Sequence, residues 1–177
     1  NSITDWFLKG AMLDKRFELA AVCSRNIDKA KAFGNKYGGA AAYSSINEMA
    51  ESPDVDAVYI AVPNSVHAQY ALACMNAGKH VLCEKPMAFT RQETLELYRL
   101  AQDKGVVLLE GIKAAYCPGF QQLINVARSG KIGEICSVEA CFTRLADMNS
   151  RERTDARYGG AFLEFGGYVL LPIIKLL

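Results

Sequence analysis

The sequence lacks the features that would direct a protein to nucleic acid or into a membrane. Its 177 residues carry 20 Lys and Arg against 19 Asp and Glu, and the basic residues form no stripe or tail. Nucleic acid is therefore not an expected partner. No apolar stretch has the length of a membrane span, and no charged start leads into an apolar block typical of a secretory signal. We expect a cytoplasmic protein without membrane contact.

The spacing of metal-binding motifs is also missing. The sequence has six cysteines and two histidines. No Cys-x-x-Cys pair occurs, and no histidine lies close enough to a cysteine to complete a zinc set. The cysteines are Cys23, Cys74, Cys83, Cys117, Cys136 and Cys141. We therefore expect no metal site, and we expect the thiols to be reduced and buried.

Both ends of the sequence lack features of a complete chain. It starts at Asn1 without a methionine, directly in an amphipathic stretch that predicts a helix with no strand before it. It stops at residues 175–177, inside an apolar pattern. We interpret the sequence as a fragment of a longer polypeptide that lacks a first strand and most of a C-terminal domain.

Between the ends, strand and helix patterns alternate, which is typical of an α/β protein with a doubly wound parallel sheet. Expected strands are residues 17–23, 41–43, 57–62, 79–83 and 106–110, and expected helices are 27–37, 45–50, 66–77 and 90–103. Asn26 is an expected N-cap. Ser45 with Glu48 and Thr90 with Glu93 have the spacing of capping boxes.

The strict alternation ends near Gly111, and we place a domain boundary there, between residues 1–111 and 112–177. The second part contains an expected helix at 118–127, a long alternating strand at 135–143, a polar loop at 148–158 and a helix at 161–177 that includes Pro172. The alternation in the strand predicts a sheet face buried against a second copy of the chain. The loop could lie over a pocket.

Polar groups follow two apolar strands at their carboxyl ends, the edge where open α/β sheets hold ligands. One strand runs into Pro63-Asn64 and the other into Glu84-Lys85-Pro86. Because a proline restricts the backbone before it, the Lys85 ammonium is aimed by local geometry. Lys85 is the candidate catalytic residue. The alternative is a surface lysine that happens to follow a buried strand.

Four motifs in order resemble the glucose-fructose oxidoreductase, inositol dehydrogenase and rhizopine catabolism (Gfo/Idh/MocA) family. They are the Pro63-Asn64 turn with His67, the Glu84-Lys85-Pro86 triplet, the turn at 129–133 and the segment at 159–168. The resemblance implies an NAD(P)-dependent oxidoreductase with a Rossmann-type domain followed by an α+β open-faced sheet domain. That second domain would serve substrate and subunit contacts, in a homodimer or homotetramer.

The phosphate-binding glycines of that family should precede the helix with which this sequence begins, and they are not in it. We therefore expect this stretch of chain by itself to bind cofactor poorly. The expected cofactor is NADP, with NAD possible, because Ser24-Arg25 stands at a strand end where an acid would favour NAD. The alternative is a solvated arginine. By resemblance, the other cofactor contacts are Pro63, Asn64, His67, Glu84 and Lys85; helix capping is the alternative for Asn64.

Glu164 and Tyr168 are four residues apart, so they share one helix face. Many relatives carry Asp and His there, and the His commonly acts as acid or base. We expect Glu164 and Tyr168 to act with Lys85 in catalysis, the alternative being packing and a helix-end salt bridge. Lys85, Tyr116 and Tyr168 are the expected substrate contacts, and Ala115 stands where the family often has an arginine.

The resulting hypothesis is hydride transfer between nicotinamide and a sugar, cyclitol or related hydroxy or keto compound, with Lys85 as proton relay and alkoxide stabiliser. The alternative is a catalytically silent relative that senses the dinucleotide and regulates a partner. The sequence does not identify the substrate.

Overall fold

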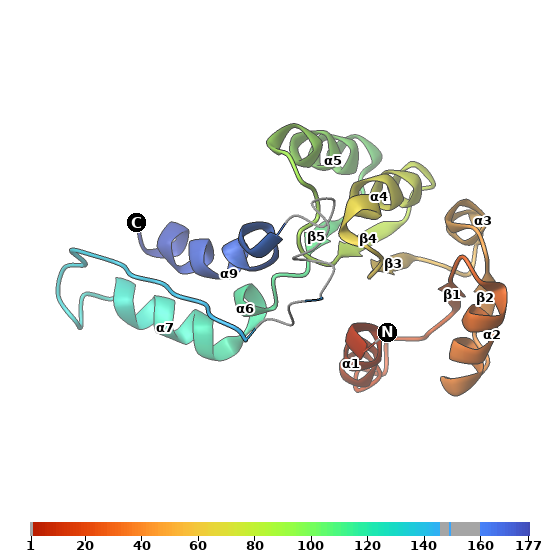
Figure 1. Cartoon of the computed structure of the whole chain (residues 1–177), viewed down its shortest axis with the longest axis horizontal. Helices are drawn as coiled ribbons and strands as arrows, with labels where there is room; N and C mark the ends of the chain where they lie inside the picture. Colours follow the sequence, from red (N-terminus) through yellow and green to blue (C-terminus); the bar gives the residue numbers. More distant parts are fainter. Residues whose placement is uncertain (1, 146–148, 150–159) are drawn as a thin grey trace.

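The computed structural model describes residues 2–145, 149 and 160–177, and it shows parallel strands alternating with helices (Figure 1). The α/β part consists of α1 (Ser2–Ala11), β1 (Ala21–Cys23), α2 (Ile27–Lys36), β2 (Ala41–Tyr43), α3 (Ile46–Glu51), β3 (Ala57–Ile60), the 3-10 turn η1 (Asn64–Val66), α4 (His67–Asn76), β4 (His80–Cys83), α5 (Arg91–Lys104) and β5 (Leu108–Glu110). Three helices follow among the described residues: α6 (Lys113–Tyr116), α7 (Pro118–Arg128) and α9 (Gly160–Leu176). The predicted order of strands and helices up to residue 110 is confirmed.

The strands form two parallel sheets rather than one. β1 pairs with β2, and β4 lies between β3 and β5. No described residue forms a strand between β1 and β3, which is where the first strand lies in the doubly wound order. Most strands are shorter than the sequence predicts, and the first begins at residue 21 instead of 17. Because β3, β4 and β5 are parallel neighbours, their carboxyl ends lie side by side.

Helix starts follow the predicted caps in two of three cases. The Asn26 side chain accepts a hydrogen bond from the Lys29 amide at 3.1 Å. Thr90 and Glu93 form the full capping box of α5. Ser45, in contrast, makes no side-chain cap bond, so its predicted capping box is wrong. Helix α3 has only six residues, and burial of its inner face holds a helix of that length better than a cap does.

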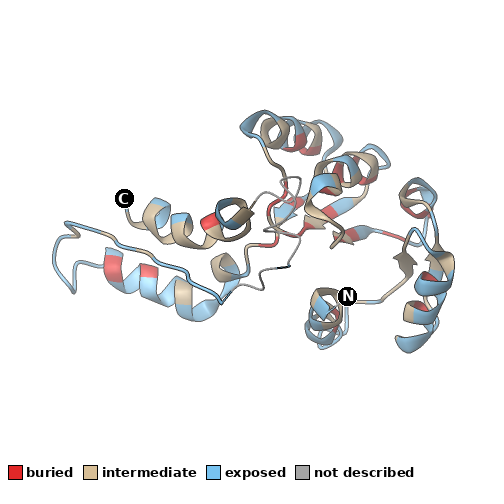
Figure 2. Ribbon diagram, viewed as in Figure 1, coloured by how far each residue is buried: buried red, intermediate tan, exposed pale blue. Residues whose placement is uncertain are grey.

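The hydrophobic core lies between the β3-β4-β5 sheet and helices α3, α4 and α5. Figure 2 shows the buried residues gathered there, whereas α7 and the segment after it are mostly exposed. The largest side chains in this core that are almost fully buried are Ile60, Met75, Leu97, Cys74 and Cys83. This packing fixes the strand ends that carry the polar groups. None of the helices in the described part of the chain combines the length and apolarity that crossing a membrane requires.

The strand predicted at residues 135–143 is wrong. The segment is extended but pairs with no described strand, and most of its residues are exposed. Alternation indicates which faces a strand would have, but a strand also needs a neighbour to take its backbone hydrogen bonds. The pairing of two copies through this segment and the domain boundary near Gly111 stay predictions. The predicted loop at 148–158, apart from Asn149, lies outside the described residues.

Helix α2 approaches the following turn so closely that residue 34 has to be a glycine. A Cβ on Gly34 would lie 2.7 Å from the Ala40 carbonyl oxygen. We expect Gly34→Ala to lower the free energy of unfolding by about 1–3 kcal/mol, since the backbone must shift. Gly10→Ala is the matched control, because nothing lies within 4 Å of its added Cβ. Denaturant unfolding of both variants checks this; equal stabilities would contradict it.

The cysteines are free but not uniformly buried, contrary to expectation. Cys74 and Cys83 are buried, Cys23 is half-buried, and Cys117, Cys136 and Cys141 are exposed. Exposure follows from position, because the last three lie beyond the core, next to α7 and in the segment that follows it.

Burial raises the pKa of the Cys74 thiol to about 11 and that of Cys83 to about 12. Because the thiolate is the nucleophile, iodoacetamide at pH 8 should label neither cysteine in the folded protein and both in denaturant. Cys117, which is exposed, is the internal positive control. Peptide mass spectrometry reads out the result, and labelling of Cys74 or Cys83 as fast as Cys117 would contradict it.

Candidate active site

Lys85 lies two residues after the end of β4, which is the middle strand of the three-stranded sheet and is largely apolar. Its side chain is only 16% exposed. The Nζ atom donates to the Glu164 carboxylate at 2.7 Å and to the Glu164 backbone carbonyl at 2.8 Å. An ammonium group at a strand end is thus held against a helix that lies 79 residues away in the sequence.

Helix α9 presents Glu164, Phe165 and Tyr168 to the Lys85 ammonium. Nζ lies 5.9 Å from the Phe165 ring centroid and 5.7 Å from that of Tyr168, within the range of cation-π attraction. Both rings stack on Phe142, at centroid distances of 5.0 and 5.5 Å. The structure therefore brings together the three residues that the sequence predicts as catalytic. Their roles stay predictions.

Glu84 is buried and its carboxylate is fully engaged. It accepts a hydrogen bond from the Tyr59 hydroxyl at 2.5 Å and forms an ion pair with the Lys113 ammonium at 2.9 Å. Burial, and then the Glu84 hydrogen bond, raise the pKa of the Tyr59 phenol. Phe7 of α1 stacks on Tyr59 with ring centroids 3.9 Å apart. Glu84 thus ties α1, β3 and α6 to the strand end that carries Lys85.

Sequence reasoning missed Tyr59 and gave Lys113 no role. A tyrosine inside an apolar strand is a usable signal, because a buried phenol needs a hydrogen-bond partner. The partner itself cannot be read from the sequence, since Tyr59 and Glu84 are 25 residues apart.

His67 lies in the interior rather than at an open surface. It is 1% exposed, and its two ring nitrogens lie 2.8 Å from the Pro86 carbonyl oxygen and 2.9 Å from that of Val62. A direct cofactor contact by this ring does not match that arrangement, because both nitrogens already face backbone oxygens. The ring instead links the turn after β3 to the turn after β4.

The remaining cofactor candidates lie at strand ends. Ser24 and the exposed Arg25 join β1 to α2, and the Ser24 hydroxyl accepts a bond from the Asn26 amide at 3.4 Å. Pro63 and Asn64 follow β3 and are half-buried. No side-chain cap bond forms at the start of η1 or α4, so the structure gives the capping alternative no support.

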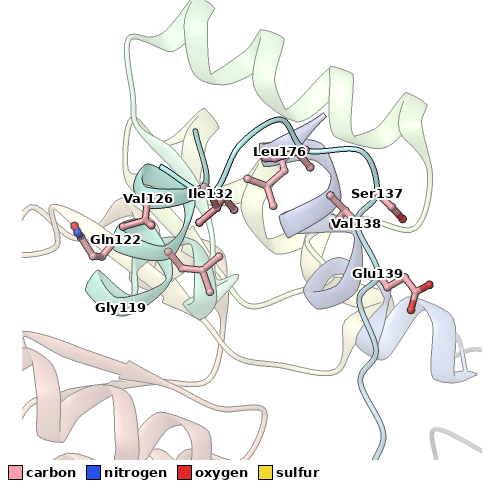
Figure 3. A pocket seen from close by; sticks show the side chains of 11 residues that line it. Gly119, Gln122, Val126, Ile132, Ser137, Val138, Glu139 and Leu176 are labelled. Carbon is pink, nitrogen blue, oxygen red and sulfur yellow. The ribbon is translucent and has the colours of Figure 1, made fainter. Parts of the chain in front are cut away.

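A pocket adjoins Lys85, lined by Lys85, Pro86, Glu110, Ile112, Phe162, Leu163, Gly166, Gly167 and Leu170. Tyr116, the other substrate candidate, is 53% exposed nearby, and its hydroxyl lies 3.4 Å from the Glu110 carbonyl oxygen. A second pocket lies between α7, the extended segment at 132–139 and the end of α9 (Figure 3). Its lining is mainly apolar, with Glu139 as its one charged residue, so it offers little for chemistry. The pocket at Lys85 is therefore the candidate active site.

The match to known proteins agrees with this geometry. A family model described as an oxidoreductase family with an NAD-binding Rossmann fold matches residues 4–112. The chain belongs to this family, Gfo/Idh/MocA. Membership confirms the predicted α/β Rossmann class and the resemblance drawn from the four motifs.

Several Gfo/Idh/MocA relatives align over most of the chain. A scyllo-inositol 2-dehydrogenase (NADP(+)) of Bacillus subtilis is 37% identical over 99% of this chain and 56% of its own length. A trans-1,2-dihydrobenzene-1,2-diol dehydrogenase of Bos taurus is 34% identical over 86% of this chain and 46% of its own. A 3-ketoreductase from Actinomadura kijaniata, solved with NADP and TDP-benzene, superposes with a TM-score of 0.81 at 34% identity, over 91% of this chain and 50% of its own. The chain thus spans about half the length of the relatives it matches.

Proposed function

We propose that the complete protein is an NADP-dependent oxidoreductase that interconverts a secondary alcohol and a ketone on a sugar, cyclitol or related small molecule. The observation that carries the proposal is the Lys85 ammonium, little exposed at a sheet end, held by Glu164 and facing Tyr168 beside a pocket. The names of the relatives support it, since they describe a dehydrogenase of an inositol, a dehydrogenase of a cyclic diol and a 3-ketoreductase.

The residues present fit a nicotinamide dinucleotide. Ser24-Arg25, Pro63-Asn64 and Glu84-Lys85 all follow the carboxyl ends of parallel strands, the edge at which this type of sheet binds dinucleotides. Arg25 would meet a 2′-phosphate, and Lys85 would meet the substrate oxygen. When bound, the nicotinamide ring supplies the acceptor or donor of the hydride.

Lys85 would handle the proton that accompanies the hydride. In the oxidation direction Glu164, 2.7 Å from Nζ, would first take a proton from the Lys85 ammonium. The amine formed in this way would accept the substrate hydroxyl proton as the carbon loses hydride, which leaves a carbonyl. In the reduction direction the Lys85 ammonium donates a hydrogen bond to the carbonyl oxygen and stabilises negative charge that develops there. The Tyr168 phenol would orient the same oxygen.

The test uses the complete protein with NADP and a panel of inositols, cyclic diols and ketoses. We expect the absorbance of reduced nicotinamide to change with at least one member of the panel. Cofactor binding is measured separately by calorimetry. A protein that binds NADP but leaves it unchanged with every compound would instead support the dinucleotide-sensing alternative. No binding and no turnover would contradict both.

A further inference from the structure

The peptide group between Pro86 and Met87, one residue beyond Lys85, is held on both sides by side chains to which the proposed chemistry assigns no part. The Pro86 carbonyl oxygen lies 2.8 Å from His67 Nδ1, and the Met87 amide donates to Glu110 Oε1 at 2.8 Å. These two backbone groups belong to the same peptide unit, which is planar and rigid. Contacts to its oxygen and to its nitrogen therefore fix both the position and the orientation of that plane.

The two side chains come from opposite sides of β4. His67 begins α4, just after β3, and Glu110 is the last residue of β5. The second nitrogen of His67 lies 2.9 Å from the Val62 oxygen, which anchors the ring to the end of β3. Because carbonyl oxygens only accept, each contact is a hydrogen bond only where that ring nitrogen carries a proton. A neutral imidazole carries one, and the bond to Pro86 requires it on Nδ1. Side chains that follow β3 and end β5 thus both contact the turn after β4.

His67 and the Met87 backbone are closed to water, whereas Glu110 is half-buried at the edge of the pocket. His67 is 1% exposed and Met87 2% exposed. A buried amide or carbonyl without a hydrogen-bond partner costs free energy, and this cost favours keeping both the Pro86 and the Met87 contacts formed. The Lys85 side chain, by contrast, has four rotatable carbon bonds, and its Cα is the fixed point from which the ammonium is aimed.

We propose that His67 and Glu110 are positioning residues that clamp the Pro86–Met87 peptide and thereby set where the Lys85 ammonium meets the substrate. The inference rests on the role proposed for Lys85. Small displacements of a reacting group are expensive, and a shift of about 1 Å lowers turnover by about a hundredfold. A second explanation for Glu110 is direct action of its charge on the substrate, since Glu110 also lines the pocket.

Glu110→Gln and Glu110→Met in the complete protein separate these explanations. The glutamine keeps an oxygen that accepts from the Met87 amide, whereas the methionine keeps the size and removes the acceptor. We expect kcat to stay within about threefold for Gln and to fall by about a hundredfold for Met, with KM for NADP nearly unchanged in both. Equal losses in the two variants would show that the charge matters and would overturn the clamp.

His67 offers a second matched pair. Asparagine places an amide nitrogen near the position of Nδ1, which faces Pro86, and glutamine places one near Nε2, which faces Val62. Both remove the ring, so both lose packing. We expect His67→Asn to retain at least about tenfold more turnover than His67→Gln. Equal turnover, or a better glutamine variant, would contradict the clamp.

The Lys85→Met background tests whether the clamp acts through Lys85. There, Glu110→Met should lower turnover no further, because the group it positions is gone. If Lys85→Met alone leaves turnover intact, the role proposed for Lys85 fails, and the clamp is then tested by hydrogen exchange alone. Glu110→Met should speed exchange of the Met87 amide by about tenfold or more, whereas Glu110→Gln should not. Unchanged exchange in Glu110→Met overturns the clamp whatever kcat does.

Discussion

Lys85→Met is expected to lower kcat of the complete protein by about 10²–10⁴-fold, the usual contribution of a positioned acid or base. Methionine has a similar length and keeps the apolar stem, but it removes the ammonium that Glu164 holds at 2.7 Å. In the proposed binding mode several other strand ends would also hold the cofactor, so its affinity should change by less than about threefold. Steady-state kinetics gives kcat, and calorimetry with NADP gives the affinity.

Lys79→Met is the matched control. Lys79 precedes β4 at its amino end, and its Nζ donates to the Ser52 carbonyl at 2.9 Å. Ligands bind at the carboxyl ends of the strands, so this variant should keep full turnover and lose only about 1 kcal/mol of stability with its hydrogen bond. Equal turnover of the Lys85→Met variant and the wild type would remove Lys85 from the mechanism.

Local signals in the sequence predict the parts of the fold that depend on near neighbours. Thr90 and Glu93 are three positions apart, so the two partners of this capping box meet in any helix that starts there. The same spacing at Ser45 fails, since α3 is short and its formation depends on what it packs against. At residues 135–143 the alternation is real, but the partner that would make it a strand is not encoded in the segment itself.

The candidate site is predictable only in part, because its contacts join residues far apart in the sequence. The family motifs bring Lys85, Glu164 and Tyr168 to attention, and the i, i+4 spacing places the last two on one face. The other contacts of the site depend on how the strands pair, which brings together residues that are far apart in the sequence. Tyr59 meets Glu84 across neighbouring strands, and His67 meets Pro86 across 19 residues of chain. No local pattern specifies such a meeting, so the sequence does not reveal that the His67 ring lies between two backbone oxygens. Its predicted cofactor contact stays a prediction.

Arg25→Ala is expected to raise KM for NADP by about 10–100-fold and to leave KM for NAD nearly unchanged. Arg25 is exposed at the carboxyl end of β1, beside the start of α2. A 2′-phosphate there would receive charged hydrogen bonds from the guanidinium, and loss of one such contact costs about 1.5–3 kcal/mol. NAD has a hydroxyl at that position and gains little from the arginine. The ratio of the two kcat/KM values is the measurement.

The control and the converse variant decide what Arg25 does. Arg99→Ala removes an exposed arginine on α5, remote in sequence from β1, and should leave both KM values as they are. Ser24→Asp in the Arg25→Ala background places a carboxylate at the strand end, where it would accept bonds from the ribose hydroxyls and repel a phosphate. This double variant should prefer NAD. If Arg25→Ala behaves like Arg99→Ala, the arginine is only solvated, and cofactor choice must be set at another strand end.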